Sequence, residues 1–141
     1  TGNVKEWVHD YYLVSVPTTS PLRKVADINN CIKKAIKNNL DMVFSVTKSS
    51  KNPYFNMVKV KNNKLELVLS LKKKISRRQD APECFDLTTV CYVFKPEYIL
   101  KTKNNLFSGK TGFIEIPKNR SIDIDDKEDY QMAKFLSVKT R

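Results

Sequence analysis

The feature that most constrains the fold is the succession of an apolar run, an amphipathic segment and a second apolar run near the start of the chain. Residues 11–16 are almost all apolar, which is typical of a strand buried on both faces of a sheet. Residues 41–47 contain Met42-Val43-Phe44 and predict a second strand. Between them, apolar residues recur at the spacing of one helix face: Ile28, Cys31, Ile32, Ala35 and Ile36. These segments predict a βαβ unit whose strands form a parallel pair joined by a right-handed crossover.

The middle of the chain has the pattern of a β-hairpin. Residues 54–60 and 65–71 are strand-like runs on either side of the Asn-rich turn Lys61-Asn62-Asn63-Lys64. Asparagine tolerates the backbone conformation that tight hairpin turns require. A basic stretch follows, with Lys72-Lys73-Lys74 and then Arg77-Arg78.

The remainder of the chain returns to an alternation of strands and helices. Residues 87–94 form an apolar, β-rich run, and residues 112–116 predict a further strand. Pro96 is placed to begin a short helix, because proline is favoured in a first helical turn. A final helix, which Asp125 can cap, carries apolar residues on one face: Tyr130, Ala133 and Leu136. The fold class is therefore predicted to be α/β.

Length and composition fit one folded domain. The 141 residues are 40% apolar and 29% charged, which is ordinary for a single core. No apolar run is long enough to span a bilayer, and the chain does not start with a signal-peptide pattern. It begins Thr1-Gly2-Asn3 without an initiator methionine, which indicates a fragment or a processed piece. A cytoplasmic location is the default expectation.

Cysteine and histidine offer little material for metal or triad chemistry. The cysteines Cys31, Cys84 and Cys91 lack CxxC spacing, and they fit free buried thiols better than a disulfide or a metal site. The single histidine, His9, is too little for a zinc site. The formal net charge of +11 favours anionic partners, but nucleic acid, a nucleoside triphosphate and a sugar carboxylate all qualify.

Two short motifs could carry chemistry. In the sequence Ser121-Ile122-Asp123-Ile124-Asp125-Asp126, an extended backbone would point Asp123 and Asp125 to the same side, with the isoleucines toward the core. Two carboxylates at a strand end suit Mg²⁺, although they are also consistent with a solvated strand end and a helix cap.

The second motif, Pro17-Thr18-Thr19-Ser20-Pro21-Leu22-Arg23, follows a predicted strand and precedes a helix. Ligands of open α/β sheets bind at such positions, where hydroxyls and free amides meet. Arg23 could hold a phosphate or carboxylate by two hydrogen bonds, or the loop could only cap the helix.

A third stretch, residues 76–82, places Arg77 and Arg78 after the hairpin, where guanidinium groups would suit a carboxylate ligand. Basic runs are, however, usually solvated. By composition alone, four aromatic residues are more typical of a core than of ligand platforms: Tyr54, Phe55, Phe107 and Phe113.

In this order, the motifs resemble those of the acylneuraminate cytidylyltransferase family, the CMP-sialic acid synthetases. Residues 19–23 match its TSPLR motif, and residues 121–125 match its SIDID metal motif. Arg78-Gln79, followed by Pro82 and Phe85, is similar to an arginine-bearing segment of the family, and Phe107 to an aromatic residue of its sugar pocket. The resemblance covers the whole chain, and the ordered set is more specific than any one motif.

The resemblance implies a Rossmann-like nucleotidyltransferase core, of which residues 1–141 would be the C-terminal two-thirds. Residues 55–86 would be a protruding hairpin segment that serves dimerisation, so a homodimer is expected. The reaction implied is attack of the anomeric hydroxyl of a nine-carbon acidic sugar on the α-phosphate of CTP, with release of pyrophosphate.

The same resemblance assigns roles to individual residues. Asp123 and Asp125 would hold Mg²⁺ and, with Arg23, form the catalytic set. The substrate-binding residues would be Thr19, Ser20, Arg78, Gln79 and Phe107. Ser20 and Arg23 would line the junction between nucleotide and sugar. Arg78 would bind the acidic part of the sugar, in its own site or in that of the other subunit, and Phe107 would pack on the apolar substituents of the sugar.

The sequence also departs from the family pattern. Pro17, Asp86 and Thr88 stand where many members have a glutamine, a second arginine and an asparagine. These changes fall on the sugar side, so the substrate could be a relative of sialic acid such as legionaminic or pseudaminic acid. The N-terminal nucleotide loop, rich in Gly, Ser and Lys, has no counterpart, because the chain has only three glycines and none so arranged. The chain alone is therefore expected to bind CTP poorly or not at all.

Two further functions compete with this enzyme hypothesis. One is an inactive fragment whose hairpin supports only dimerisation. The other is a basic nucleic-acid-binding module, motivated by the net charge and by the cluster from Lys72 to Arg78. No RRM, KH or helix-turn-helix signature accompanies that cluster, so nucleic acid is the less favoured partner. No membrane association is expected.

Overall fold

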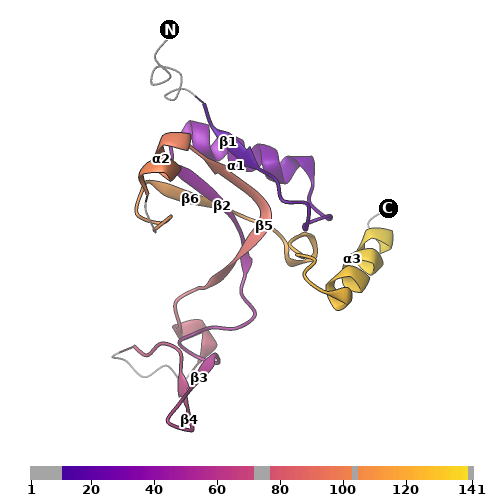
Figure 1. Ribbon diagram of the computed structural model, residues 1–141. Helices are drawn as coiled ribbons and strands as arrows, with labels where there is room; N and C mark the ends of the chain where they lie inside the picture. Colours follow the sequence, from indigo (N-terminus) through magenta and orange to yellow (C-terminus); the bar gives the residue numbers. More distant parts are fainter. Residues whose placement is uncertain (1–10, 72–76, 103–104, 140–141) are drawn as a thin grey trace. The chain divides into compact units, whose positions relative to one another are not determined.

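The computed structural model describes residues 11–71, 77–102 and 105–139, which form two units (Figure 1). One unit contains the described residues up to Thr47 and from Leu87 onward, and the other contains those within Lys48–Asp86. Three features of the sequence lie outside the described residues: the start Thr1-Gly2-Asn3, His9, and Lys72-Lys73-Lys74 of the basic stretch.

The first unit is built on a four-stranded mixed sheet. Its strands are β1 (Leu13–Ser15), β5 (Phe85–Phe94), β2 (Met42–Lys48) and β6 (Thr111–Glu115), in the order β1-β5-β2-β6. β1 is antiparallel to β5, and β2 is parallel to β6. The N–H of Lys95, directly after β5, donates to the carbonyl of Asp41, directly before β2, at 2.9 Å. These two neighbours are therefore antiparallel as well.

The predicted pairing of the two N-terminal strands is wrong, because β5 lies between β1 and β2. Both strands are antiparallel to β5, so β1 and β2 do run in the same direction. The intervening strand comes from a distant part of the sequence, and strand spacing along the chain cannot reveal such a non-local insertion.

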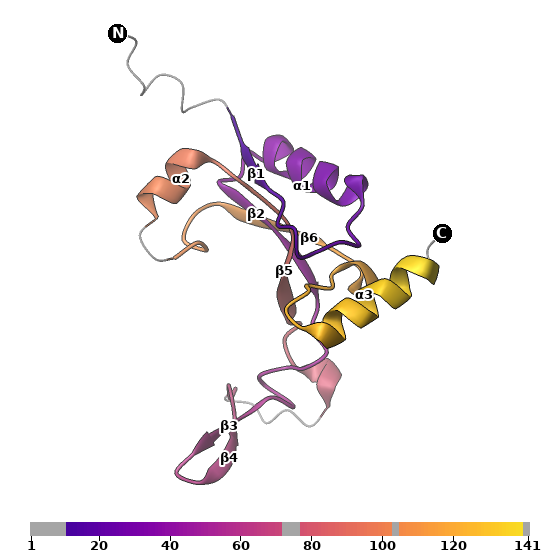
Figure 2. The same ribbon diagram turned by 45° about the vertical axis from the view of Figure 1, so that its right-hand side comes forward.

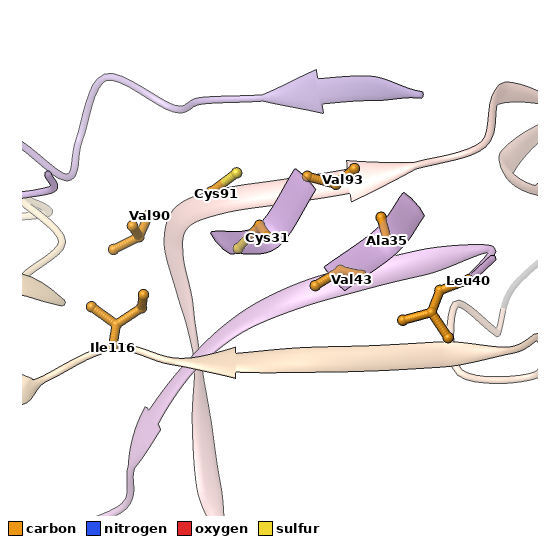
Figure 3. Packing of buried hydrophobic residues seen from close by; sticks show 8 residues of the cluster. All are labelled: Cys31, Ala35, Leu40, Val43, Val90, Cys91, Val93 and Ile116. Carbon is orange, nitrogen blue, oxygen red and sulfur yellow. The ribbon is translucent and has the colours of Figure 1, made fainter. Parts of the chain in front are cut away.

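The core of this unit lies between the sheet and α1 (Val25–Lys37), which extends along one face of the sheet (Figures 1 and 2). Cys31 and Ala35 of α1 are fully buried against side chains from β2, β5 and the end of β6, as Figure 3 shows. The predicted helix face is confirmed except at Ile36, which is 60% exposed because it lies at the edge of that face.

The end of α1 is fixed by its backbone. Asn39 has a φ of 46°, the left-handed conformation that asparagine tolerates better than most residues. The N–H of Leu40 then donates to the carbonyl of Ala35, and that of Asn39 to the carbonyl of Ile36. This Schellman pattern closes the helix and turns Leu40 into the core, so that the chain can enter β2.

β1 differs from the doubly buried strand predicted for residues 11–16. It spans only Leu13–Ser15, and its three residues are exposed. The physical reason is position: β1 is the last strand on its side of the sheet in the described part of the chain. The half-buried Tyr12 anchors its start, since the hydroxyl lies 3.1 Å from the carbonyl of Ala35 and 3.0 Å from that of Leu40.

The two remaining helices follow the predictions with one correction. α2 (Pro96–Lys101) begins at Pro96 as expected. α3 (Lys127–Lys139) is capped by Asp126, whose Oδ1 accepts the N–H of Asp129 at 2.8 Å, and not by Asp125. On the predicted inner face of α3, Ala133 is buried, but Tyr130 is 52% exposed.

The three cysteines are free, as predicted. Cys31 and Cys91 are fully buried in the core of the first unit, whereas Cys84 is only partly buried in the second unit. A hydrogen bond between the Cys31 and Cys91 thiols, together with burial, raises the pKa of Cys31 above its usual value. Both thiols are therefore core groups in this structure.

The second unit contains the predicted hairpin, formed by β3 (Val58–Lys61) and β4 (Lys64–Leu67). Its turn residues, Asn62 and Asn63, have φ values of 50° and 58°, as a type I′ turn requires. Before the hairpin, the buried side chain of Asn52 accepts the N–H of Tyr54 and donates to the carbonyl of Pro82. A role of this unit in dimerisation stays a prediction.

Across the described residues, no helix combines the length and apolarity needed to cross a bilayer.

Candidate functional site

The loop between β1 and α1 is held by the side chain of Arg23. Its Nε donates to the carbonyl of Ser20 at 2.7 Å, and Nη2 donates to the carbonyl of Pro17. Its Nη1 donates to the carbonyl of Val90 in β5 at 3.2 Å. The guanidinium therefore connects both ends of the loop with the neighbouring strand.

Ser20 provides a second attachment of this loop to the sheet. Its side chain is fully buried, and its Oγ lies 2.6 Å from the hydroxyl of Thr89 in β5. Thr19, by contrast, is partly buried, and Thr18 is exposed. The predicted site residues Thr19 and Ser20 thus occupy one loop, but the Ser20 hydroxyl faces the sheet in this structure.

The loop is in direct contact with the aspartate motif. The N–H of Ile124 donates to the carbonyl of Thr19 at 2.8 Å. Ile124 stands between Asp123 and Asp125, so this one hydrogen bond brings two motifs together that are about a hundred residues apart in the sequence (Figure 2). The contact lies where the chain leaves β1, which is the kind of position at which open α/β sheets bind ligands.

The aspartate motif is not the strand end that its alternation predicted. β6 ends at Glu115, and residues 121–124 have no regular secondary structure. The two carboxylates also differ in environment. Asp123 is partly buried, and its Oδ1 is buried without a hydrogen-bond partner among the described residues. Asp125 is exposed, and its N–H donates to Oδ2 of Asp129.

A salt bridge fixes the chain just before this motif. Arg120 donates through Nη2 to Oδ1 of Asp27 at 2.7 Å and through Nε to Oδ2 at 3.2 Å. Burial raises the pKa of Asp27, but the hydrogen bonds from Arg120 and the Lys24 backbone and the positive charges of both residues outweigh it. The net effect is a pKa below the usual 3.8, so Asp27 is ionised at neutral pH.

Three aromatic rings form a row on the sheet. Phe44 of β2 stacks on Phe107, with ring centroids 4.9 Å apart and planes inclined by 23°. The same ring meets Tyr92 of β5 edge to face at 6.3 Å. Burial raises the pKa of the Tyr92 hydroxyl, and the charge of nearby Asp123 raises it further. Tyr92, at one end of the row, is therefore close enough to Asp123 to respond to its charge.

Phe107 is presented by a short loop that Tyr98 of α2 supports. The Tyr98 hydroxyl donates to the carbonyl of Leu106 at 2.8 Å and accepts the N–H of Gly109 at 3.0 Å. A Cβ at Gly109 would lie 2.4 Å from the Tyr98 ring, so glycine is required at this close approach. Phe107 is 60% exposed, and the composition-based expectation of a core position is wrong for this residue and for Phe113, which is 48% exposed.

The other two predicted substrate residues, Arg78 and Gln79, belong to the second unit. They line a cleft of about 430 Å³ within this unit, together with residues that include Lys51, Asn52 and Cys84. Nη2 of Arg78 donates to the carbonyls of Ser49 and Ser50 at 3.1 and 3.2 Å. The side chain of Arg78 is exposed in the structure, as is that of Gln79.

Several residues that shape the site were not found from the sequence. Phe44, Tyr92 and Thr89 read as ordinary strand residues, and only the pairing of β2 and β5 shows that they adjoin the motifs. Thr88, which replaces an asparagine of the family pattern, is buried and donates to Oγ of Ser45 at 2.7 Å. In the described part of the chain, no three His, Cys, Asp or Glu side chains gather as a complete metal site.

Comparison with known proteins identifies relatives of the chain. No family model matches the sequence. The chain is 28% identical over 124 residues to the post-translational flagellin modification protein B of Campylobacter coli, which covers 88% of the chain and 52% of the relative. It is 36% identical over 86 residues to the CMP-N,N'-diacetyllegionaminic acid synthase of Campylobacter jejuni, which covers 61% of the chain and 35% of the relative.

These similarities support the resemblance found in the motifs: the chain is similar to one protein named as a CMP-sugar synthase and to one named as a flagellin modification protein. The chain spans about half the length of one of these relatives and about a third of the other.

Proposed function

We propose that this chain forms part of a cytidylyltransferase that transfers CMP from CTP to the anomeric hydroxyl of a nine-carbon acidic sugar and releases pyrophosphate. The observation that carries the proposal is the hydrogen bond between Ile124 and Thr19, because it joins the loop and the aspartate motif in one place. A relative named as a CMP-N,N'-diacetyllegionaminic acid synthase supports a sugar of the sialic, legionaminic or pseudaminic type.

The donor set at this place fits a magnesium ion. Oδ1 of Asp123 is buried without a hydrogen-bond partner among the described residues, which is costly unless a cation or donor satisfies it. Mg²⁺ typically takes one or two protein carboxylates and completes its shell with waters and substrate phosphates. Asp123 and Asp125 would hold the ion, which would neutralise charge on the triphosphate of CTP.

The remaining residues would bind and orient the sugar and the nucleotide. Thr19 and Ser20 lie in the loop that contacts the aspartate motif, and the exposed face of Phe107 offers an apolar surface to the acyl substituents of the sugar. Arg78 and Gln79 would recognise the carboxylate of the sugar, in the site of the same or of the partner subunit of a homodimer. The reaction as a whole is proposed for the longer protein, since the chain spans only part of its relatives.

The test is pyrophosphate release from CTP by the longest native polypeptide that contains this chain. The assay supplies Mg²⁺ and, in turn, each of a set of nine-carbon acidic sugars, and turnover with at least one sugar is expected. Asp123→Asn should lower kcat about 100-fold, because it removes charge where charge on the phosphates must be balanced.

Asp126→Asn is the matched control. It removes one charge three residues away, and asparagine still caps α3, so kcat should change little. Absence of turnover with every sugar of the set, or equal losses in the two variants, would overturn the proposal.

A further inference from the structure

We infer that Arg23 is a positioning residue of this site: it sets the place of Asp123 and Asp125 through Thr19 and Ile124, and it does not hold the substrate itself. The inference deepens the proposed function and rests on it for the role of the two carboxylates. Its contacts, however, are properties of the chain alone.

The first step is the way in which the guanidinium is used. Each of its three nitrogens donates to a backbone carbonyl, those of Pro17, Ser20 and Val90. Nε carries a single hydrogen, which Ser20 accepts, so the fork cannot bind a phosphate through its Nε side. The side chain points into its own loop.

The second step is where these carbonyls lie. Pro17 and Ser20 belong to the loop, whereas Val90 belongs to β5, the strand that pairs with β1. Next to Val90 in the same strand, Thr89 holds the fully buried Ser20 through its hydroxyl at 2.6 Å. The loop is thus attached to β5 at two successive residues of that strand.

The third step connects the loop with the carboxylates. Thr19 lies between Pro17 and Ser20, both of which accept hydrogen bonds from Arg23. The carbonyl of Thr19 therefore has a fixed position, and it accepts the N–H of Ile124 at 2.8 Å. Because residues 121–124 have no strand or helix of their own, this hydrogen bond is a main determinant of where the flanking Asp123 and Asp125 lie.

Lysine cannot replace arginine in this role, although it has the same charge. An ammonium on a flexible stem does not present the rigid fork that reaches three carbonyls in three directions. A residue that binds phosphate through charge alone would, in contrast, tolerate lysine in part. Arg23→Lys therefore separates the two roles.

The experiment measures Mn²⁺ binding to the isolated chain by the paramagnetic broadening of its backbone amide resonances. In the unmodified chain, added Mn²⁺ should broaden the resonances of Asp123, Ile124 and Asp125. Arg23→Lys should weaken this binding about 10-fold or more, the usual effect of losing a residue that orients metal ligands. It should also speed hydrogen exchange at the Ile124 amide when no metal is present.

Two further variants make the result specific. Thr89→Val leaves Arg23 intact but removes the partner of Ser20, and it should weaken Mn²⁺ binding in the same direction by a smaller factor. Arg77 is an exposed residue of the second unit, so Arg77→Lys should leave both Mn²⁺ binding and Ile124 exchange unchanged. If Arg23→Lys fails to fold, Thr89→Val still tests whether the attachment of the loop to β5 sets the place of the carboxylates.

Unchanged Mn²⁺ affinity and unchanged Ile124 exchange in Arg23→Lys would overturn the inference. So would a loss confined to CTP affinity in the longer protein, because that pattern belongs to a residue in contact with the nucleotide. If the unmodified chain shows no broadening, the metal role in the proposed function fails and the part of the inference that concerns the carboxylates as metal ligands fails with it. Ile124 exchange then decides whether Arg23 positions the segment.

Discussion

Two strands of the first unit have similarly apolar sequences and opposite environments. In β2, the side chains from Met42 to Thr47 are buried, and Val43 is 0% exposed. In β1, Leu13 and Val14 are 45% and 38% exposed. β2 lies between β5 and β6 with α1 packed on one face, whereas β1 has one neighbouring strand among the described residues. An apolar run thus predicts a strand, but its burial depends on which neighbours the fold supplies.

The largest loss of stability is expected at Phe44, the buried residue of β2 whose ring stacks on Phe107. Phe44→Ala removes a ring that is 4% exposed and should lower the free energy of unfolding by about 3 kcal/mol. Phe107→Ala removes the exposed partner of the same stack and should cost about 1 kcal/mol. Urea denaturation followed by circular dichroism measures both losses of free energy. Equal losses would show that the buried ring of Phe44 contributes no more to stability than the exposed ring of Phe107.

A smaller effect is expected from one pair of valines that compares the two strands directly. Val43→Ala should destabilise the chain by about 2 kcal/mol, since it leaves a cavity between the sheet and α1. Val14→Ala should change the free energy of unfolding by no more than about 0.5 kcal/mol, because that side chain is already partly in water. The same urea titration measures both, and a large loss for Val14→Ala would mean that β1 is covered in solution.

The contrast between β1 and β2 also shows what sequence could and could not predict. α1, the hairpin turn at Asn62-Asn63 and the start of α2 follow from local patterns, and all three are confirmed. The insertion of β5 between β1 and β2 depends on hydrogen bonds between distant segments, so strand spacing predicted the wrong neighbour.

The same division applies to the candidate site. The loop and the aspartate motif could be found because their order along the chain resembles that of a known family, and the catalytic set that this resemblance implies requires them to lie close together. The inward turn of Arg23 could not be predicted, because its acceptors are backbone carbonyls, one of them in β5. Phe44 and Tyr92 were missed for a related reason, since their role comes from sheet pairing and not from their sequence context.

The salt bridge between Asp27 of α1 and Arg120, just before the aspartate motif, should make the stability of the chain depend on pH. The pKa of Asp27 is lowered in the folded chain. The stability that ionised Asp27 contributes is therefore present above the unfolded pKa near 3.8 and is lost as pH falls through the lower folded pKa. Arg120→Gln should remove about 1.5 kcal/mol at neutral pH and reduce this acid dependence.

The measurement is a series of thermal melts of both proteins from neutral pH down to pH 3. The two stability curves should converge towards the acid end, because protonated Asp27 no longer attracts Arg120. Parallel curves would show that another carboxylate causes the acid sensitivity of the unmodified chain.

The hairpin of the second unit is a further case of exposed strands, because all residues of β3 and β4 are exposed, like those of β1. Burial does not specify these strands, so the turn should. Asn63→Gly places the residue with no Cβ penalty at a φ of 58° and creates the Asn-Gly pair preferred in type I′ turns. It should stabilise the hairpin by about 0.5 kcal/mol, whereas Asn63→Val should destabilise it, because a β-branched side chain is strained at positive φ. Amide exchange in β3 and β4 measures both variants, and if protection is equal in the two, cross-strand pairs such as Lys59 with Glu66 specify the hairpin instead of its turn.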